Sequence, residues 1–376
     1  MTMHDATTAS TRDEGVAPPT EPRQTAPAYR SDAAWLALLA SYRQPDRRRS
    51  VFELGITIVP FLALWALAWI AVAHGWWAGL LLTVPAAGLL VRLFMIQHDC
   101  GHGSFFARRP IDDWTGRVLG VLTLTPYDYW RRTHAVHHAS SGNLDARGIG
   151  DILTLTVAEY RALSGWGRLR YRLYRHPAVM FGIGPLWVFL VQNRLPLGMM
   201  RAGAAPWISV MATNLALALL AAVTIWSGGL VPFLAVELPI IMLGGAAGIW
   251  LFYVQHQFEE TDWAVAGDWR FPRSALHGSS LYELPPVLAW LTANVGIHHV
   301  HHLSSRVPHY RLAEVLRDYP ELRRIGRITI PESLRGVRLA LWDESRHRLV
   351  PFHEARASYA SATAGFLGGE TCDLGN

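Results

Sequence analysis

Apolar residues gather in four long runs along the chain, with polar segments between them. The runs occupy residues 53–73, 76–93, 206–226 and 230–252. Each is close to the ~20 residues that a helix needs to cross the hydrocarbon core of a bilayer. One such run alone could be a buried helix of a soluble protein. Four runs in one chain predict an all-α integral membrane protein with four transmembrane helices.

The four runs are arranged as two pairs. An uncharged turn of two residues (74–75) joins the first pair, and one of three residues (227–229) joins the second. Turns this short predict two helical hairpins, each crossing the membrane and returning. A shorter apolar stretch at 178–191 is interrupted by two glycines and a proline. Its length predicts an interfacial or re-entrant helix instead of a fifth span.

The charged residues predict the orientation of the hairpins. The chain has no lysine, so arginine supplies all 34 basic residues and the net charge of +5. The arginines flank the apolar runs and avoid both short turns, a pattern typical of cytoplasmic segments. We therefore expect the N-terminus, residues 94–205 and residues 253–376 in the cytoplasm. The basic excess is then explained by anionic lipid head groups, and no motif indicates nucleic-acid binding.

The ends of the chain predict tails around one membrane domain. Residues 1–30 are polar, lack the apolar core of a secretory signal, and are expected to be disordered. Residues 355–376 are small and polar and are expected to be flexible, which leaves 31–354 as the membrane domain. Cys100 and Cys372 are too few for a disulfide framework, consistent with a reducing compartment.

Histidines supply the candidate chemistry, because eight of the 17 fall in three tight clusters on the expected cytoplasmic side. The clusters are His98 and His102; His134, His137 and His138; and His298, His301 and His302, with His299 as an additional member of the last. Spacings of three and four place imidazoles on one face of a helix. A lone histidine, His256, follows the fourth run and is a candidate ninth ligand.

This number of imidazoles predicts two metal ions. Eight or nine exceed the four ligands of one zinc site, whereas two ions with four or five ligands each would use them all. Imidazole suits zinc, copper, iron and nickel, so the ligand type does not select the metal. A non-enzymatic membrane metal-binding or transport protein is a distant alternative. It would place ionisable residues inside the spans, and only Glu237 lies well inside one.

The three clusters and their flanks resemble those of the membrane fatty acid desaturases, especially the bacterial acyl-lipid branch that makes Δ12 (ω-6) double bonds. The resemblance covers about residues 90–315. It rests on the segments 98–106, 134–143, 253–259 and 294–303. It implies that the two hairpins carry a cytosolic helical cap with a histidine-rich di-iron site.

The resemblance also implies the reaction and its partners. We expect two iron ions, O2 as co-substrate, and a fatty acyl lipid or acyl thioester as substrate, in a bacterial inner membrane. The HPGG haem segment of fused cytochrome b5 domains is absent from the sequence. The electron donor is therefore expected to be a separate protein, with ferredoxin the donor that the bacterial branch suggests. Hydroxylation or ketolation of acyl chains, alkanes or carotenoids on the same scaffold is the alternative.

The resemblance further implies how the ligands divide between the two irons. One iron would use His98, His102, His134, His138 and His302, and the other would use His137, His256, His298 and His301. Nearby polar residues are expected to fix the imidazole tautomers, namely Asp99, Asp145, Glu259, Asp262 and Asn294. Phe252 replaces an asparagine that the stearoyl-CoA branch has four residues before the lone histidine. This replacement predicts a different outer ligand or an open position.

Overall fold

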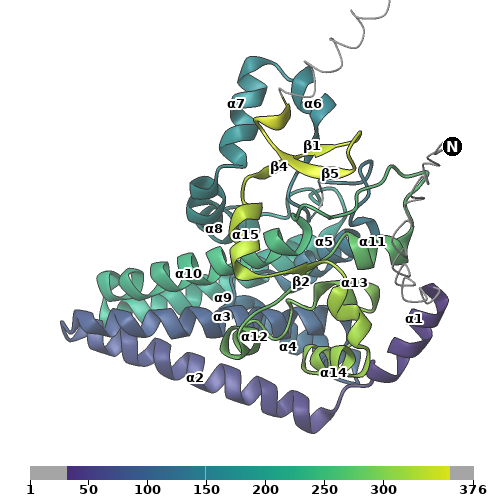
Figure 1. The fold of residues 1–376 in the computed structure, drawn as a ribbon. Coiled ribbons are helices and arrows are strands. Elements are labelled where there is room, and N and C mark those ends of the chain that lie inside the picture. Colours follow the sequence, from purple (N-terminus) through teal and green to yellow (C-terminus); the bar gives the residue numbers. More distant parts are fainter. Residues whose placement is uncertain (1–31, 149, 356–376) are drawn as a thin grey trace, which may run out of the picture.

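The computed structural model describes residues 32–148 and 150–355, and its fold is mostly helical (Figure 1). The tails expected at 1–30 and 355–376 lie outside the described residues, apart from Ala355, which is buried. Within the described residues, four helices are long and apolar enough to cross a membrane. They are α2 (Arg47–Ala73), α3 (Thr83–His102, preceded by the 3-10 turn η2, Trp77–Leu82), α9 (Ala204–Gly228) and α10 (Leu230–His256).

These helices confirm the four predicted runs, and they extend past them at the ends where the histidines lie. Helix α3 continues to His102, and α10 continues to His256. The metal-site candidates on these two helices therefore belong to the last turns of the spans themselves. Only 22% of the apolar window of α2 and 17% of that of α9 is buried inside the protein. The remaining apolar surface of both helices suits lipid, since a soluble protein would bury it.

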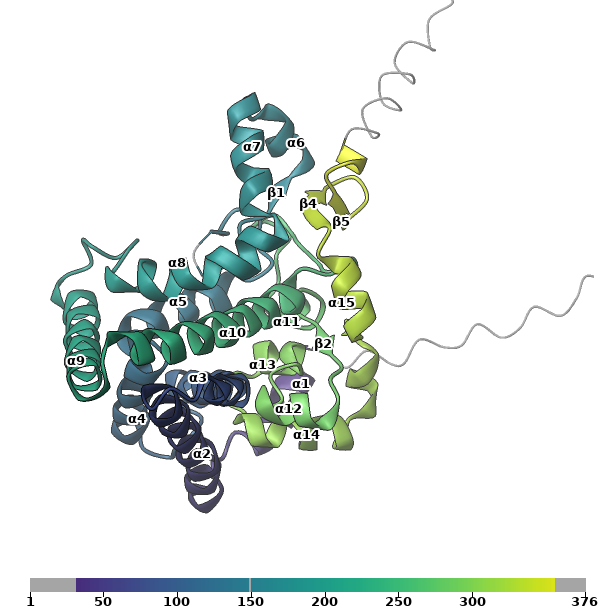
Figure 2. The same ribbon diagram turned by 90° about the vertical axis from the view of Figure 1, so that its left-hand side faces the viewer.

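The two hairpins pack side by side through α3, which contacts both α2 and α10 (Figure 2). Glycine makes the close approach between α3 and α10 possible. A Cβ atom at Gly244 would lie 3.1 Å from Leu90 Cδ2 and 3.3 Å from the Ala87 carbonyl oxygen. Close backbone approach at small residues is the usual packing mode of helices in lipid.

The apolar stretch at 178–191 forms short helical pieces instead of one long helix. It comprises a π-helical turn η3 (Ala178–Ile183), α8 (Gly184–Leu190) and the 3-10 turn η4 (Gln192–Arg194). At its tip, Arg194 donates hydrogen bonds to the Leu124 carbonyl oxygen and, at 2.9 Å, to Asn214 Oδ1 of α9. Asn214 lies ten residues into α9, about 15 Å along the helix. The segment therefore packs against α9, and it is not among the described helices that are long enough to cross a membrane.

The remaining helices form a cap at one end of the bundle (Figure 1). They are α1 (Asp32–Leu39), η1 (Ala40–Tyr42), α4 (Arg109–Leu122), α5 (Tyr127–Ser140), α6 (Val157–Ala162), α7 (Gly165–Tyr174), α11 (Phe271–His277), α12 (Pro286–Leu291), α13 (His298–Leu303), α14 (His309–Asp318), η5 (Pro320–Arg324) and α15 (Ile330–Gly336).

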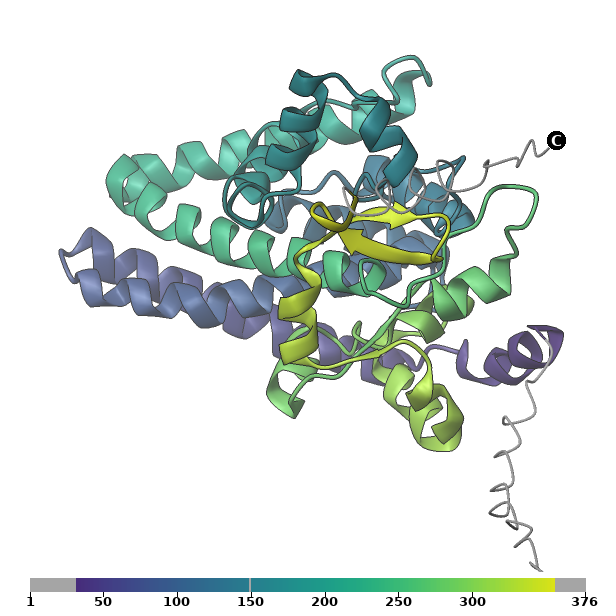
Figure 3. The ribbon, with the colours of Figure 1, turned by 45° about the horizontal axis from the view of Figure 1, so that its top comes forward.

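Two small sheets in the cap were not expected from the sequence (Figure 3). One sheet has the order β1-β4-β5, with β1 (Leu155–Thr156) parallel to β4 (Leu339–Asp343), which pairs antiparallel with β5 (Arg348–Pro351). The other pairs β2 (Leu281–Tyr282) in parallel with β3 (Arg327–Ile328). Strands of two to five residues are too short to give a clear alternating pattern, so the sequence did not predict them.

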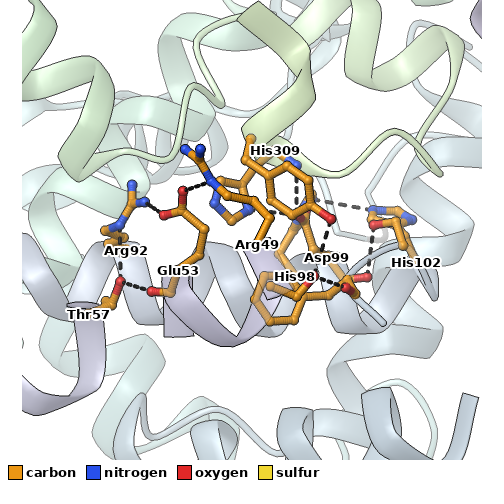
Figure 4. A network of polar contacts seen from close by, with 12 residues as sticks. Arg49, Glu53, Thr57, Arg92, His98, Asp99, His102 and His309 are labelled. Atoms are coloured by element: carbon orange, nitrogen blue, oxygen red, sulfur yellow. Dashed lines mark hydrogen bonds and ion pairs between the residues drawn. The ribbon is translucent and has the colours of Figure 1, made fainter. Parts of the chain in front are cut away.

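A buried ion pair joins α2, α3 and the cap (Figure 4). Arg92 and Glu53 are each 2% exposed and form this pair. Arg92 also donates to Thr57 Oγ1 at 3.1 Å and to the Trp290 carbonyl oxygen, and its guanidinium lies 4.3 Å from the centre of the Trp290 ring. A buried charge is tolerated only when such partners replace water. Glu237 is also paired, because it accepts a 2.7 Å hydrogen bond from Trp65 Nε1.

Candidate metal centre

The nine histidines singled out in the sequence lie together where α3, α5, α10 and α13 meet. Helix α3 contributes two from its last two turns, and α5 contributes three from its second half. The last residue of α10 is His256, and α13 contributes three over its six residues. These helices come from distant parts of the chain. The fold brings their histidines together at one end of the spans, as the prediction of two hairpins requires.

The nine side chains divide into two groups, each with its ligand nitrogens within 4.8 Å of one another. The first group is His98, His102, His134, His138 and His301, and the second is His137, His256, His298 and His302. The expected partition is therefore wrong for one pair, because His301 and His302 are exchanged. On a helix, residues four apart share a face, so His302 accompanies His298. His301 points about 100° away from His302, toward the first group.

The nitrogen–nitrogen distances fit shared metal ions. In the first group, successive Nε2 atoms lie 3.3 Å (His98–His102), 3.1 Å (His102–His134), 3.1 Å (His134–His138) and 3.1 Å (His138–His301) apart. In the second group, the Nε2 atoms of His298 and His256 are 3.0 Å apart. Two nitrogens bound to one ion at about 2.1 Å would be separated by roughly 3.0–3.4 Å. The residues present therefore fit two metal ions.

The protonation state of the site also suits a metal. Burial and the neighbouring imidazoles lower the pKa of His134, His138, His298, His301 and His302 well below the usual histidine value. These rings are therefore neutral near pH 7, and the neutral imidazole is the metal-binding form. The buried Nε2 atoms of His137 and His302 have no hydrogen-bond partner among the described residues. A bound ion would satisfy both.

Hydrogen bonds to the other ring nitrogens orient two ligands of the second group. His137 Nδ1 pairs with a carboxylate oxygen of Asp151, whose side chain is 8% exposed. His256 Nδ1 lies 3.0 Å from the carbonyl oxygen of Gly278, which accepts its hydrogen. Such acceptors on the outer nitrogen fix the tautomer that leaves Nε2 free for a metal. Asp151 was not among the residues expected from the sequence, because no regular spacing relates it to His137.

Asp99, expected to support a ligand, lies between His98 and His309 (Figure 4). Its Oδ1 is 3.6 Å from His98 Nδ1, and its Oδ2 accepts two 2.8 Å hydrogen bonds, from Nδ1 and from the backbone N–H of His309. No cluster in the sequence includes His309. In the structure, His309 is 2% exposed and holds Asp99 in place.

Three of the other four polar residues expected to support the ligands pair with other groups, and Asn294 has a special backbone conformation. Asp145 accepts a hydrogen bond from the Ala266 N–H at 2.7 Å, Glu259 pairs with Arg348 at 3.0 Å, and Asp262 pairs with Arg273 at 2.6 Å. Asn294 has a φ of +54°, and its backbone closes the turn before α13. Asparagine tolerates this left-handed conformation, which explains the residue type there without a role at a metal.

Phe252 and Cys100 both act through packing. The Phe252 ring centre lies 5.0 Å from that of His137 and 5.3 Å from that of His256. Beside these rings is a cavity of about 10 Å³, which is also lined by Asp151. That volume holds about one water molecule. A small open space therefore remains beside Phe252, the residue that replaces the asparagine of the stearoyl-CoA branch. Cys100 is fully buried in the apolar cluster around α3 and is no thiolate ligand.

The Asp151→Asn variant is expected to bind iron at the second group about 10–100-fold more weakly, while the first group keeps its ion. An amide presents a donor or a weaker acceptor to His137 Nδ1, so the ring loses its fixed tautomer. Iron content after stepwise chelation checks this. The Asp145→Asn variant is the matched control, because Asp145 lies in the same loop region and contacts a backbone amide. Equal iron retention in the two variants would contradict the role of Asp151.

A large apolar cavity leads from the histidines into the span bundle. Its volume is about 850 Å³, and His98, His134 and His298 line one end of it. Along α10 it extends from Gln255 to Ile241, which corresponds to about 21 Å of helix. Its walls come from α3, α5, α8 and α10. A long, narrow apolar substrate therefore fits this space with one segment beside the metal ligands.

Comparisons with known proteins agree with this architecture. Residues 74–330 match the family model described as fatty acid desaturase. A protein named fatty acid desaturase from Bacillus subtilis is 43% identical over 314 residues, covering 84% of this chain and 89% of the relative. An sn-1 acyl-lipid omega-3 desaturase (ferredoxin) from Synechocystis is 28% identical, covering 58% of this chain and 61% of the relative. An sn-1 oleoyl-lipid 12-desaturase from the same organism is 26% identical, covering 70% and 72%.

Proposed function

This chain belongs to the fatty acid desaturase family, and we propose that it introduces a Δ12 (ω-6) double bond into a membrane-resident acyl chain through a histidine-ligated di-iron centre. The observation that supports the proposal most directly is the cavity that brings a long apolar chain to two groups of converging imidazoles. The family membership excludes the distant alternative of a transport protein.

The chemistry requires a strong oxidant at a dry site. Two bound irons would supply O2 activation, which an unactivated C–H bond needs. Overall, adjacent methylenes lose two hydrogens, while O2 takes up these hydrogens, two electrons and two protons and becomes two waters. The first five histidines would hold one iron and the other four the second. The chain's own residues keep the imidazoles neutral, orient His137 through Asp151 and His256 through the Gly278 carbonyl oxygen, and exclude water from the acyl chain.

Regiochemistry, substrate and electron donor are part of the proposal. The relatives include oleoyl-lipid 12-desaturases of two cyanobacteria, which support a Δ12 position and a lipid-bound substrate. Two of the relatives carry ferredoxin in their names, which supports a ferredoxin-type carrier as the separate electron donor. Placing the acyl chain within the bundle also favours a substrate that already resides in the bilayer.

The fatty acid profile of a host that makes oleate but no diunsaturated acids tests the proposal. Expression of the chain with a ferredoxin and its reductase is expected to produce linoleate. If hydroxylated fatty acids appear instead, the proposed reaction changes to hydroxylation, while the proposed metal site stays the same. A monounsaturated product with a different double-bond position would overturn the Δ12 assignment but keep the reaction. An unchanged profile would overturn the acyl substrate.

The proposed location is the bacterial inner membrane, with both termini and the metal site in the cytoplasm. The arginine distribution and the position of the cap at one end of the spans support this orientation. Tags on the N-terminus and the C-terminus are expected to be digested by protease added to inside-out vesicles and protected in intact spheroplasts. Opposite accessibility of the two tags would contradict the arrangement of four spans.

A further inference from the structure

Two cap helices expose apolar side chains in the same pattern. On α4, Ile111, Trp114 and Val118 are exposed, and on α7, Trp166, Leu169 and Leu173 are exposed. Both sets occupy positions i, i+3 and i+7, which fall within one narrow stripe of a helix. The two tryptophans are 65% and 67% exposed, which is far more than a tryptophan in a protein core.

The opposite faces of both helices are buried, so the stripes point away from the protein. Asp112 and Leu119 of α4 are 0% and 1% exposed, and Tyr171 of α7 is 5% exposed. Each helix therefore has one side in the cap and an apolar side that no described residue covers. Without a partner, the two stripes would expose two tryptophans and four aliphatic side chains to water, which is unfavourable. Apolar surface of this kind usually marks a contact with a protein or a membrane.

The stripes lie at the level where the spans end. At the start of α4, Arg109 donates to the carbonyl oxygen of Gly101, in the last turn of α3. Just after α7, Arg175 donates to Gln257 Oε1 at 2.8 Å and lies over the Tyr253 ring, at the end of α10. In Figures 1 and 2, α4 and α7 run across the direction of the spans, on different sides of the bundle.

We propose that α4 and α7 are interfacial helices that lie in the head-group region of the leaflet on the cap side, with anionic lipid as their partner. The stripes continue the lipid-facing apolar surface of the spans at its edge, which is where tryptophan is favoured. Arginines border both stripes. Arg117 lies 4.9 Å from the centre of the Trp114 ring and pairs with Asp128 at 2.8 Å. On α7, Arg172 donates to the Tyr160 hydroxyl at 2.6 Å, and the neighbouring Arg170 is exposed.

This position of α7 bears on the substrate, a step that rests on the proposed function. Tyr174, the last residue of α7, lines the large cavity, and its hydroxyl accepts a 3.1 Å hydrogen bond from the Leu153 N–H. A membrane-bound α7 therefore holds one wall of the cavity at the level of the lipid head groups. An acyl chain could then enter the cavity while its head group stays at the membrane surface.

Spin labels on single cysteines test the interfacial position without measuring activity. In a Cys372→Ser background, with Cys100 protected by burial, the test variants are Val118→Cys on α4 and Leu169→Cys on α7. Val223→Cys on the lipid-facing side of α9 and Glu344→Cys in the exposed β4–β5 turn are the matched controls. Each labelled protein is placed in phosphatidylglycerol nanodiscs. Collision rates with oxygen, which partitions into lipid, and with a water-soluble nickel chelate are then compared.

Labels at 118 and 169 are expected to favour oxygen over the nickel chelate, as the label at 223 does. A ratio like that at 344 would overturn the proposal. Protection from both reagents, with spin–spin broadening, would also overturn it in favour of contact with a second copy. In phosphatidylcholine nanodiscs, the 169 label is expected to become more accessible to nickel, because the exposed Arg170 beside it loses its anionic partners. Equal ratios in the two lipids would overturn the preference for anionic head groups.

Discussion

The His137→Ala variant is expected to form no detectable double bonds and to lose iron, while it still inserts into the membrane. His137 belongs to the smaller group, whose four imidazoles leave no spare ligand. Loss of a direct ligand should exceed the 10–100-fold cost of losing an outer partner such as Asp151. The side chain lies in the cap, on α5, so the spans keep their apolar surfaces. Iron per chain, product formation and membrane fractionation together check this expectation.

His299→Gln is the matched control for this experiment. His299 lies within the third cluster and is fully buried, but its Nε2 lies 3.1 Å from the Leu322 carbonyl oxygen and it belongs to neither group. Burial also lowers its pKa to about 4, so the ring is neutral, and the glutamine amide can replace its hydrogen bond. Iron content and activity should therefore stay near those of the parent. Full activity of His137→Ala would remove His137 from the ligands, and iron loss in His299→Gln would show that the grouping is incomplete.

The Gly248→Leu variant is expected to lose most activity on long acyl chains such as oleoyl, with unchanged iron content. Gly248 lines the cavity, and a Cβ atom placed there would meet nothing within 4 Å. It precedes His256 by eight residues, about 12 Å along α10. A leucine would displace about three methylenes of the substrate. At ~0.8 kcal/mol per methylene this costs about 2.4 kcal/mol, or roughly 50-fold in kcat/KM.

The Gly55→Leu variant separates this effect from a general change in a span. Gly55 lies in α2, away from the cavity, and a Cβ atom there also meets nothing within 4 Å. Its leucine variant should desaturate oleoyl substrate like the parent, whereas Gly248→Leu should retain activity on shorter chains that end before the new side chain. Equal activity of the two variants on oleoyl substrate would mean that the acyl chain does not pass Gly248.

The sequence predicted the spans well because lipid constrains each one locally. A helix in hydrocarbon must satisfy its own backbone and present apolar side chains along its whole length, so each span is visible without its neighbours. The histidines were equally visible, because spacings of three and four record a helical face directly. The stretch at 178–191 was distinguished from a span by its shorter length and by its two glycines and one proline. The eight histidines identified in this way and the lone His256 all belong to the two groups that could hold metal ions.

What only the tertiary structure decided depends on contacts between distant segments. It assigned His301 and His302 to opposite groups, because the direction in which α13 approaches the other helices sets where each ring points. The structure also showed that Asp151 contacts His137 and that Asp99 contacts His309. The other acidic residues have different partners, namely Asp145, Glu259 and Asp262. Loop residues approach a site only after the whole chain has packed, and no local periodicity records that approach. The sequence therefore determined the spans and the candidate metal-binding side chains, whereas the packing of the cap determined the grouping of these histidines, their outer partners and the cavity.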